Sequence, residues 1–339
     1  MALTAAPKFF TIESAAYPGY CITQQGNQVV LKSKDALNPF QLWYRDESWN
    51  LLNQEFSDRD EFLDQDISHL SAFVFVNHGS KKALRSQAYS TSQSKATIGD
   101  YDPAGQDNYL LWRISGSHEN QVLITMTVNK SSFLSHTSSS ASFKDGVPVV
   151  TSNSNGNSHW KLVTYKPSQE YRILCHWFGQ YLTWKQQNVD VTFKNAVKHN
   201  DETNVVAISP NNVPLDSMTW YKVPAGGRDD TTYFTSFVLI NKVTGLALKG
   251  SAKPGDKVLL TQYDPLNYSF VWSENRFQAS NTDYLAINLD GTTLQWALQN
   301  DDQYQNSAWY HPLVLRSASP NQGYLEQQAW KFNPVVAGN

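Results

Sequence analysis

The stretch Phe73-Val-Phe-Val-Asn77 decides the fold, because a closely similar stretch, Phe237-Val-Leu-Ile-Asn241, occurs in the second half of the chain. Both stretches are followed, in the same order, by an Ala-Leu pair, a Tyr-Asp-Pro turn and a closing tryptophan, which is Trp112 or Trp272. Self-similarity of this extent is the signature of a repeated structural unit. The two halves of the chain are therefore predicted to be copies of one another.

Each half divides again into three segments, and every segment ends on a tryptophan that follows a pair of short strands with a Gly or Asn turn. The closing residues are Trp43, Trp112, Trp160, Trp220, Trp272 and Trp330. Three similar units per domain, each closed by a bulky aromatic side chain, are typical of a β-trefoil. Tryptophan buries a large area, so we expect these residues to fill the core rather than to contact a ligand.

Composition and periodicity both favour strands. Aromatic residues make up 13% of the chain and charged residues only 17%. Short alternating runs such as Gln121-Val-Leu-Ile-Thr125 occur throughout, and helical periodicity is almost absent. A length of 339 residues is enough for two domains. We therefore predict an all-β chain with two tandem β-trefoil domains, residues 1–165 and residues 166–339.

Charge and cysteine content limit the partners and the compartment. The net charge of -3 and the pI near 6.2 give no electrostatic basis for binding nucleic acid. No run of about 18 apolar residues could span a membrane, and the N-terminus does not read as a secretory signal, although a signal already removed is left open. Cys21 and Cys175 occupy unmatched positions, so no disulfide framework is expected. These features favour the cytoplasm or the nucleus.

Sequence patterns for catalysis are missing. The chain has no Gly-rich phosphate loop, no Gly-x-Ser-x-Gly and no His or Cys pair at zinc spacing. Two carboxylates from distant positions could still meet to form a glycosidase, but a small trefoil core offers no deep cleft for one. We expect no enzyme activity, no cofactor and no metal.

Two parts of the chain carry a family resemblance. Residues 17–46 include Gln41-Leu-Trp43, and residues 237–274 include the more specific run Phe237-Val-Leu-Ile-Asn241 with Tyr263-Asp-Pro265. They resemble the opening and middle units of the Euonymus-type lectins, which are ricin-B-like β-trefoil domains, and the tandem arrangement is similar to that of R40-type plant stress-responsive proteins. The resemblance implies a lectin domain, glycans or glycoproteins as partners, nucleocytoplasmic residence in a plant and no catalysis.

The same resemblance implies a sugar site in the third unit of domain two. The family pattern there has an Asp-bearing strand, an Asp-Gly-Thr-Thr turn, an exposed tryptophan and a polar run before the last tryptophan. This chain keeps Asp290-Gly-Thr-Thr293, Asn321 and Gln322, but Arg316 stands where the exposed tryptophan is expected. Trp296 could supply the aromatic plane from a neighbouring strand. Sugars are held by polar groups beside an aromatic plane, so the candidate residues are Asp290, Trp296, Asn321 and Gln322.

In domain one the corresponding candidates are Asp145, Asn155 and Asn157, and Ser152 replaces the aromatic residue. A second interpretation applies to both domains: these Asp-Gly and Asn-Gly elements are hairpin turns that require positive φ angles. For domain two the two interpretations have equal weight, whereas for domain one the turn interpretation is favoured.

Two functions of different classes follow. The leading hypothesis is a non-enzymatic carbohydrate-binding protein whose two domains bind glycans through shallow pockets and gain strength through avidity. The alternative is a stress-related scaffold whose trefoils have lost sugar binding and now contact proteins, which Arg316 and Ser152 favour. The sequence does not determine the sugar, and it leaves a homo-oligomer open.

Overall fold

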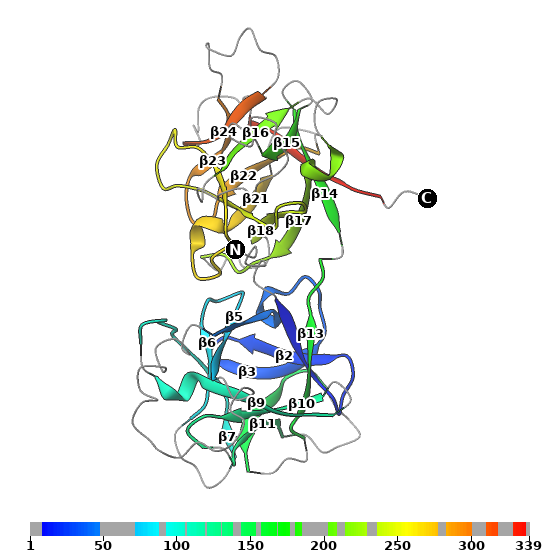
Figure 1. The fold of residues 1–339 in the computed structure, drawn as a ribbon, viewed down its shortest axis with the longest axis vertical. Coiled ribbons are helices and arrows are strands. Elements are labelled where there is room, and N and C mark those ends of the chain that lie inside the picture. The colour runs from blue at the N-terminus through cyan, green and yellow to red at the C-terminus, as the bar shows by residue number, and fades with distance from the viewer. Residues whose placement is uncertain are drawn as a thin grey trace, which may run out of the picture. The chain divides into compact units, whose positions relative to one another are not determined.

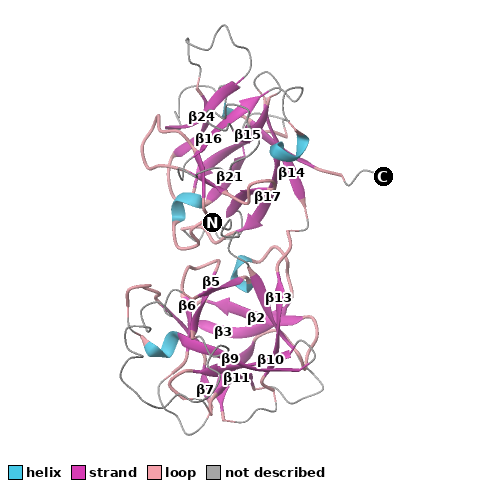
Figure 2. Ribbon diagram, in the orientation of Figure 1, coloured by secondary structure: helices cyan, strands magenta, loops and turns pink. Residues whose placement is uncertain are grey.

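The computed structural model of this chain divides into two compact units, Lys8–Tyr165 (domain one) and Lys166–Asn339 (domain two). Strands dominate both units, joined by loops and a few short 3-10 turns (Figures 1 and 2). The residues that the structure describes are 9–47, 72–87, 93–105, 107–118, 121–129, 131–137, 144–153, 157–167, 169–176, 180–184, 203–208, 214–228, 236–276, 283–299, 310–317 and 328–336.

Domain one consists of three units of four main strands. The first unit contains β1 (Phe10–Ser14), β2 (Tyr20–Gln25), β3 (Gln28–Ser33), η1 (Pro39–Gln41) and β4 (Trp43–Asp46). The second contains β5 (Phe73–Asn77), β6 (Ala83–Arg85), β7 (Ser94–Lys95), β8 (Thr97–Gly99), η4 (Asn108–Leu110) and β9 (Leu111–His118). The third contains β10 (Gln121–Met126), β11 (Phe133–His136), β12 (Val147–Ser152) and β13 (His159–Thr164).

Domain two repeats this plan. Its first unit contains β14 (Glu170–Cys175), β15 (Tyr181–Trp184), β16 (Thr203–Ile208), η7 (Leu215–Met218) and β17 (Thr219–Pro224). The second contains β18 (Ser236–Asn241), β19 (Ala247–Lys249), β20 (Leu259–Thr261), η8 (Tyr268–Phe270) and β21 (Trp272–Arg276). The third contains β22 (Leu285–Leu289), β23 (Leu294–Leu298), β24 (Tyr310–Ser317) and β25 (Trp330–Pro334). Within these described ranges, no helix is long and apolar enough to cross a membrane.

In each domain the first and fourth strands of the three units close into a six-stranded barrel. Around domain one, β1 pairs with β4, β4 with β5, β5 with β9, β9 with β10, β10 with β13, and β13 returns to β1. Domain two closes in the same way through β14, β17, β18, β21, β22 and β25. The second and third strands of each unit form a hairpin outside this ring. A closed barrel with three hairpins is a β-trefoil, as predicted for both domains.

One backbone hydrogen bond recurs at every junction between units. The residue that follows the first strand of a unit donates its N–H to the carbonyl of the residue just before the closing tryptophan of the preceding unit. The six bonds are His78 to Leu42, Thr127 to Leu111, Ala15 to His159, Lys242 to Thr219, Asp290 to Val271 and His176 to Ala329, at 2.8–3.1 Å. The same hydrogen bond therefore joins each unit to the next one around the domain.

The closing tryptophans fill the core, as predicted, and five of them also bind their own unit. All six are completely buried. The indole Nε1 donates to the carbonyl at the middle of the second strand in five units: Trp43 to Ile22, Trp112 to Leu84, Trp160 to Leu134, Trp220 to Leu182 and Trp272 to Leu248, at 2.8–3.2 Å. The Nε1 of Trp330 has no acceptor among the described residues.

The asparagine that ends the duplicated stretch has the same role in both domains. The side chain of Asn77 donates to the carbonyl of Phe40 and accepts from the N–H of Gly79, at 2.9 and 3.0 Å. The side chain of Asn241 donates to the carbonyl of Ser217 and accepts from the N–H of Val243, at 2.9 and 3.1 Å. Only an amide supplies a donor and an acceptor in this geometry, so this residue ties the turn after one strand to the 3-10 turn of the preceding unit.

The indole hydrogen bonds lead to a prediction about stability. Trp272→Phe leaves the buried carbonyl of Leu248 without its donor, whereas Trp330→Phe removes an N–H that has no partner. Both changes remove the same volume from the same core, so we expect Trp272→Phe to lower the free energy of unfolding of domain two by about 1–2 kcal/mol more than Trp330→Phe. Urea unfolding of the two variants measures this difference, and equal losses would contradict it.

Candidate functional site

Asp290 lies in the turn between β22 and β23, next to Gly291, whose φ is +67°. Its side chain is fully buried, and each carboxylate oxygen has a partner. Oδ2 accepts from the backbone N–H of Arg228 at 2.6 Å, and Oδ1 accepts from the hydroxyl of Ser236 at 2.8 Å. The carboxylate therefore fastens the segment before β18 to the third unit, and no face of it is open to a ligand in this structure.

Trp296 lies in the core rather than on the surface. Its ring is completely buried and packs edge-on against Trp272 and Trp330, with ring centroids 5.1 and 5.5 Å away. In the strand register Trp296 pairs with Leu315 and occupies the middle position of the second strand, where the other five units have Ile22, Leu84, Leu134, Leu182 and Leu248. This position faces inward in every unit, so Trp296 offers no exposed plane to a sugar.

The indole of Trp296 also explains the missing hydrogen bond of Trp330. In the other units the carbonyl at this strand position accepts from the closing tryptophan. Here the position carries a second indole instead of a smaller aliphatic side chain, and the Nε1 atoms of both Trp296 and Trp330 are buried with no partner among the described residues. The third unit of domain two therefore departs from the other five at its centre.

The remaining candidates of domain two, Asn321 and Gln322, lie outside the described residues, as does Asn155 of domain one. The structure also separates the two Asp-Gly turns. Asp290-Gly-Thr-Thr293 lies between the first and second strands of its unit, whereas Lys144-Asp-Gly146 directly precedes the third strand, β12. The two turns are therefore not equivalent.

In domain one, Asp145 and Asn157 have local partners. The carboxylate Oδ1 of Asp145 accepts from the backbone N–H and the hydroxyl of Ser33, at 2.8 and 2.7 Å. These hydrogen bonds lower the pKa of Asp145. The side-chain NH2 of Asn157 donates to the backbone carbonyl of His136 at 3.5 Å, and the backbone carbonyl of Asn157 accepts from the hydroxyl of Ser135. Asp145 is exposed and Gly146 has a φ of +95°, as a hairpin turn requires.

Arg316 and Ser152, both expected at the aromatic position, do occupy the same place in the register. Each lies on the third strand, opposite the residue just before the middle of the second strand, and that residue in turn pairs with the first strand. These rows of three are Glu13–Cys21–Lys32, Val76–Ala83–Gly99, Thr125–Phe133–Ser152, Leu174–Tyr181–Ile208, Ile240–Ala247–Thr261 and Asn288–Gln295–Arg316.

The row Asn288–Gln295–Arg316, which we call the polar row, consists wholly of polar side chains. Its neighbours along the strands, Ile287, Leu289, Leu294, Trp296 and Leu315, belong to the core. Because alternate residues of a strand face opposite sides, the polar row lies on the outer side of the three strands. Sequence reasoning missed Asn288 and Gln295, because only the register brings them beside Arg316.

The polar row has unused hydrogen-bonding capacity. The Nε2 of Gln295 donates to the Oε1 of Gln328 at 3.2 Å, which joins the row to the segment before β25. The Oδ1 of Asn288 is buried and accepts no hydrogen bond from any described residue. An amide oxygen in this state needs a donor, because leaving it unpaired costs about 1–3 kcal/mol. Asn288 and Arg316 are partly exposed, whereas Gln295 is only 3% exposed, so a ligand would meet the Arg316 guanidinium first and the amides behind it.

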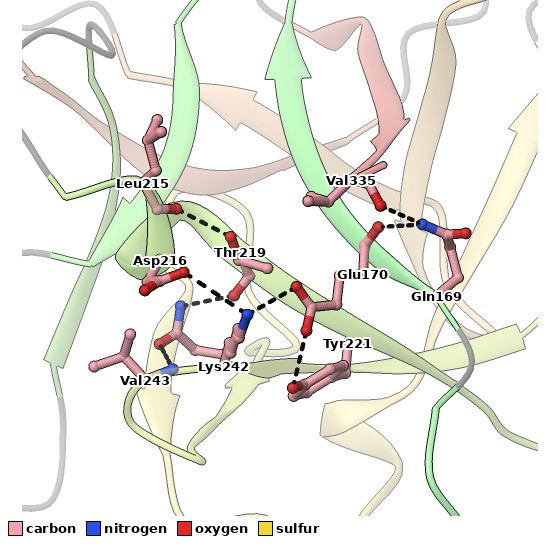
Figure 3. A network of polar contacts seen from close by, with 10 residues as sticks. Gln169, Glu170, Leu215, Asp216, Thr219, Tyr221, Lys242, Val243 and Val335 are labelled. Carbon is pink, nitrogen blue, oxygen red and sulfur yellow. Dashed lines mark hydrogen bonds and ion pairs between the residues drawn. The ribbon is translucent and has the colours of Figure 1, made fainter. Parts of the chain in front are cut away.

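A second polar cluster, formed by residues of β14, η7, β17 and the turn after β18, is internally satisfied (Figure 3). The ammonium of Lys242 lies 2.9 Å from Glu170 Oε2 and 3.7 Å from Asp216 Oδ1, and the hydroxyl of Tyr221 donates to Glu170 Oε1 at 3.2 Å. The hydrogen bond to Glu170 raises the pKa of Lys242, and burial together with the same carboxylate raises the pKa of Tyr221. These groups are paired with one another, so the cluster is a weaker candidate site than the polar row.

Metal binding finds no support in the ranges that the structure describes, because no three His, Cys, Asp or Glu side chains there converge on a common point. Cys21 and Cys175 are both buried, form no disulfide bond and lie in different domains.

The chain as a whole was compared with known proteins. The chain shares 24% identity over 293 residues with ricin B-like lectin R40G2 of Oryza sativa subsp. japonica, which covers 79% of this chain and 78% of that protein. This chain is therefore similar to ricin B-like lectins. A second one from the same plant, R40C1, is 23% identical over 285 residues, which cover 79% of this chain and 76% of that protein. No family model matches the chain.

Solved structures with a similar course of the chain include a mosquitocidal holotoxin, with a TM-score of 0.36 and 10% identity over 97% of this chain. The chain spans about a third (34%) of the length of that holotoxin. A non-toxic homologue of type II RIPs from Momordica charantia, in complex with α-methyl-D-galactoside, gives a TM-score of 0.34 and 14% identity, covering 96% of this chain and 97% of that one. The trefoil assignment itself rests on the strand pairing described above.

The contacts of Asp290 predict a structural effect of its substitution. Asp290→Asn removes the negative charge and one of the two acceptor oxygens, so the charge-assisted hydrogen bonds from the Arg228 N–H and the Ser236 hydroxyl cannot both be kept. We expect a loss of about 2–3 kcal/mol in the free energy of unfolding of domain two, measured by urea unfolding. The control is Asp264→Asn, whose carboxylate accepts only from the nearby N–H of Leu266 in an exposed turn. A loss of glycan binding by Asp290→Asn at unchanged stability would contradict this structural role.

The environment of His136 predicts a pH dependence. Burial lowers the pKa of His136 from 6.5 to about 4, so between these values the unfolded chain binds a proton that folded domain one does not. Stability is therefore full above pH 6.5 and falls as the pH drops toward 4, by up to about 3 kcal/mol. Urea unfolding at pH 7 and pH 5 measures the fall. His136→Gln should reduce it, and the exposed control His159→Gln should leave it unchanged; identical pH slopes in all three proteins would refute the assignment.

Proposed function

We propose that this chain is a non-enzymatic carbohydrate-binding protein that uses the polar row of domain two. One observation carries the proposal: of the six equivalent rows, only Asn288–Gln295–Arg316 presents two amides and a guanidinium side by side, and it does so in a chain similar to ricin B-like lectins. Amide and guanidinium groups match the donors and acceptors of sugar hydroxyls. Asn321 and Gln322, which follow Arg316 in the chain, belong to the same proposal.

The proposal assigns different roles to the candidates of the sequence analysis. Asp290 and Trp296 act through the fold, because one fastens a neighbouring segment and the other fills the core. In domain one, Asp145, Asn155 and Asn157 remain candidates for a second, weaker site. Two weak sites on one chain would raise the strength of attachment to a multivalent glycan through avidity. We place this activity in the cytoplasm or the nucleus, without a catalytic step.

A glycan array probed with the full chain, followed by calorimetric titration of the best ligand, tests the proposal. Gln295→Leu removes the central amide at similar volume, and we expect it to weaken binding at least about tenfold, since one or two hydrogen bonds are lost. The matched control is Thr261→Val in the corresponding row of the second unit, which should bind as the parent does. A folded parent protein that binds no glycan on the array would falsify the proposal.

A protein-interaction scaffold is the second candidate, and one observation favours it. Neither Arg316 nor Ser152 supplies an aromatic plane at the position where the resemblance expects one, and Trp296 is closed into the core. The scaffold predicts that the folded chain fails on the whole array. The same experiment therefore separates the two candidates.

A further inference from the structure

The polar row contains the positively charged guanidinium of Arg316, and no carboxylate of the described residues pairs with it. Three lysines of domain two lie beside carboxylates: Lys222 beside Glu274, Lys242 beside Glu170 and Lys331 beside Asp283, at 2.5–2.9 Å. Arg316 is partly exposed, and no carboxylate of the described residues forms an ion pair with it. A guanidinium presents several N–H donors in a planar fork that fits the oxygens of a carboxylate or sulfate.

The segment before β20, which borders β24, adds a second cation. Lys257 forms a β-bridge with Val314, two residues before Arg316 on β24. Residues that pair directly across strands share a face, and Val314 and Arg316 lie on the same side of β24. Lys257 is exposed. The adjoining carboxylate of Asp256 already accepts a hydrogen bond from the hydroxyl of Ser251. Lys257 therefore lies on the same side of the sheet as Arg316, across β24 from Asn288 and Gln295.

We infer that the polar row selects sugars that carry an anionic group, a carboxylate or a sulfate ester, rather than neutral sugars. Arg316 binds the anionic group through its planar fork, Lys257 adds long-range attraction, and the amides of Asn288 and Gln295 bind the neighbouring hydroxyls. The exchange of an aromatic plane for a guanidinium thus changes the ligand class instead of abolishing binding. This inference rests on the proposed carbohydrate-binding function of the same row.

The test compares matched ligands that differ only in charge. The full chain is titrated with oligogalacturonides and neutral galacto-oligosaccharides of equal length, and separately with sulfated and unsulfated galacto-oligosaccharides. We expect at least one acidic member to bind about tenfold or more tightly than its neutral counterpart, since a charge-assisted pair contributes roughly that factor. Raising the salt concentration should reduce this preference, because screening weakens it. The uronate and sulfate arms identify which anion is preferred.

Three variants assign the preference to Arg316. Arg316→Gln should lower the affinity for the acidic ligand about tenfold or more relative to its neutral counterpart, which removes the acidic preference. Arg316→Lys should retain only part of the preference, because the lysine ammonium is a point charge without the planar set of donors of a guanidinium. The control is Arg228→Gln, an exposed arginine of the same domain whose guanidinium lies over the ring of Tyr268; it should bind as the parent does.

The outcomes separate this inference from the proposed function. Equal binding of acidic and neutral ligands overturns the inference and leaves a neutral-sugar lectin. An acidic preference that survives Arg316→Gln also overturns the inference, because the anionic group is then bound elsewhere, and leaves the proposed function standing. Failure to bind any ligand of either charge overturns both. Circular dichroism of each variant establishes that it is folded, and if Arg316→Gln unfolds, Arg316→Lys together with the salt dependence decides.

Discussion

The closing tryptophan is the point on which each domain depends. The carbonyl just before it accepts a hydrogen bond from the next unit around the barrel, and in five units its indole N–H binds the second strand of its own unit. One residue position thus sets both the step between units and the placement of the hairpin within a unit. The junction bond occurs three times in each domain, and the indole bond three times in domain one and twice in domain two.

This double role explains why the fold could be predicted from the sequence. The indole binds the second strand of its unit, and the carbonyl just before it binds the next unit. The tryptophan therefore has to occupy the same place in each unit, and its spacing and neighbouring residues are retained. Asn77 and Asn241 are retained for a similar reason, since both link a turn to the unit before it. The all-β class and the tandem trefoils followed from these repeated residues. The pairing of individual strands did not, because it depends on the register between segments far apart in the chain.

The candidate site was less predictable, and the reason is again register. Asp290-Gly-Thr-Thr293 has the residues of a turn before a third strand, but it connects the first strand to the second. Trp296 stands in the run Leu294-Gln-Trp-Ala-Leu298, which has no clear polar–apolar alternation. A shift of one position decides whether such a side chain faces the core or the solvent. Arg316 could be recognised as unusual from sequence alone. Its neighbours Asn288 and Gln295 come from other strands, so only the folded sheet identifies them.

Closure of the two barrels has a consequence for recognition. Every barrel strand is hydrogen-bonded on both sides, since β13 returns to β1 and β25 returns to β14. The rings therefore present no open edge onto which a partner could add a strand of its own. A partner therefore cannot bind to the main chain of the barrel strands, and selectivity has to come from side chains that project outward. A single substitution among these side chains can change the ligand that a unit prefers without changing its backbone.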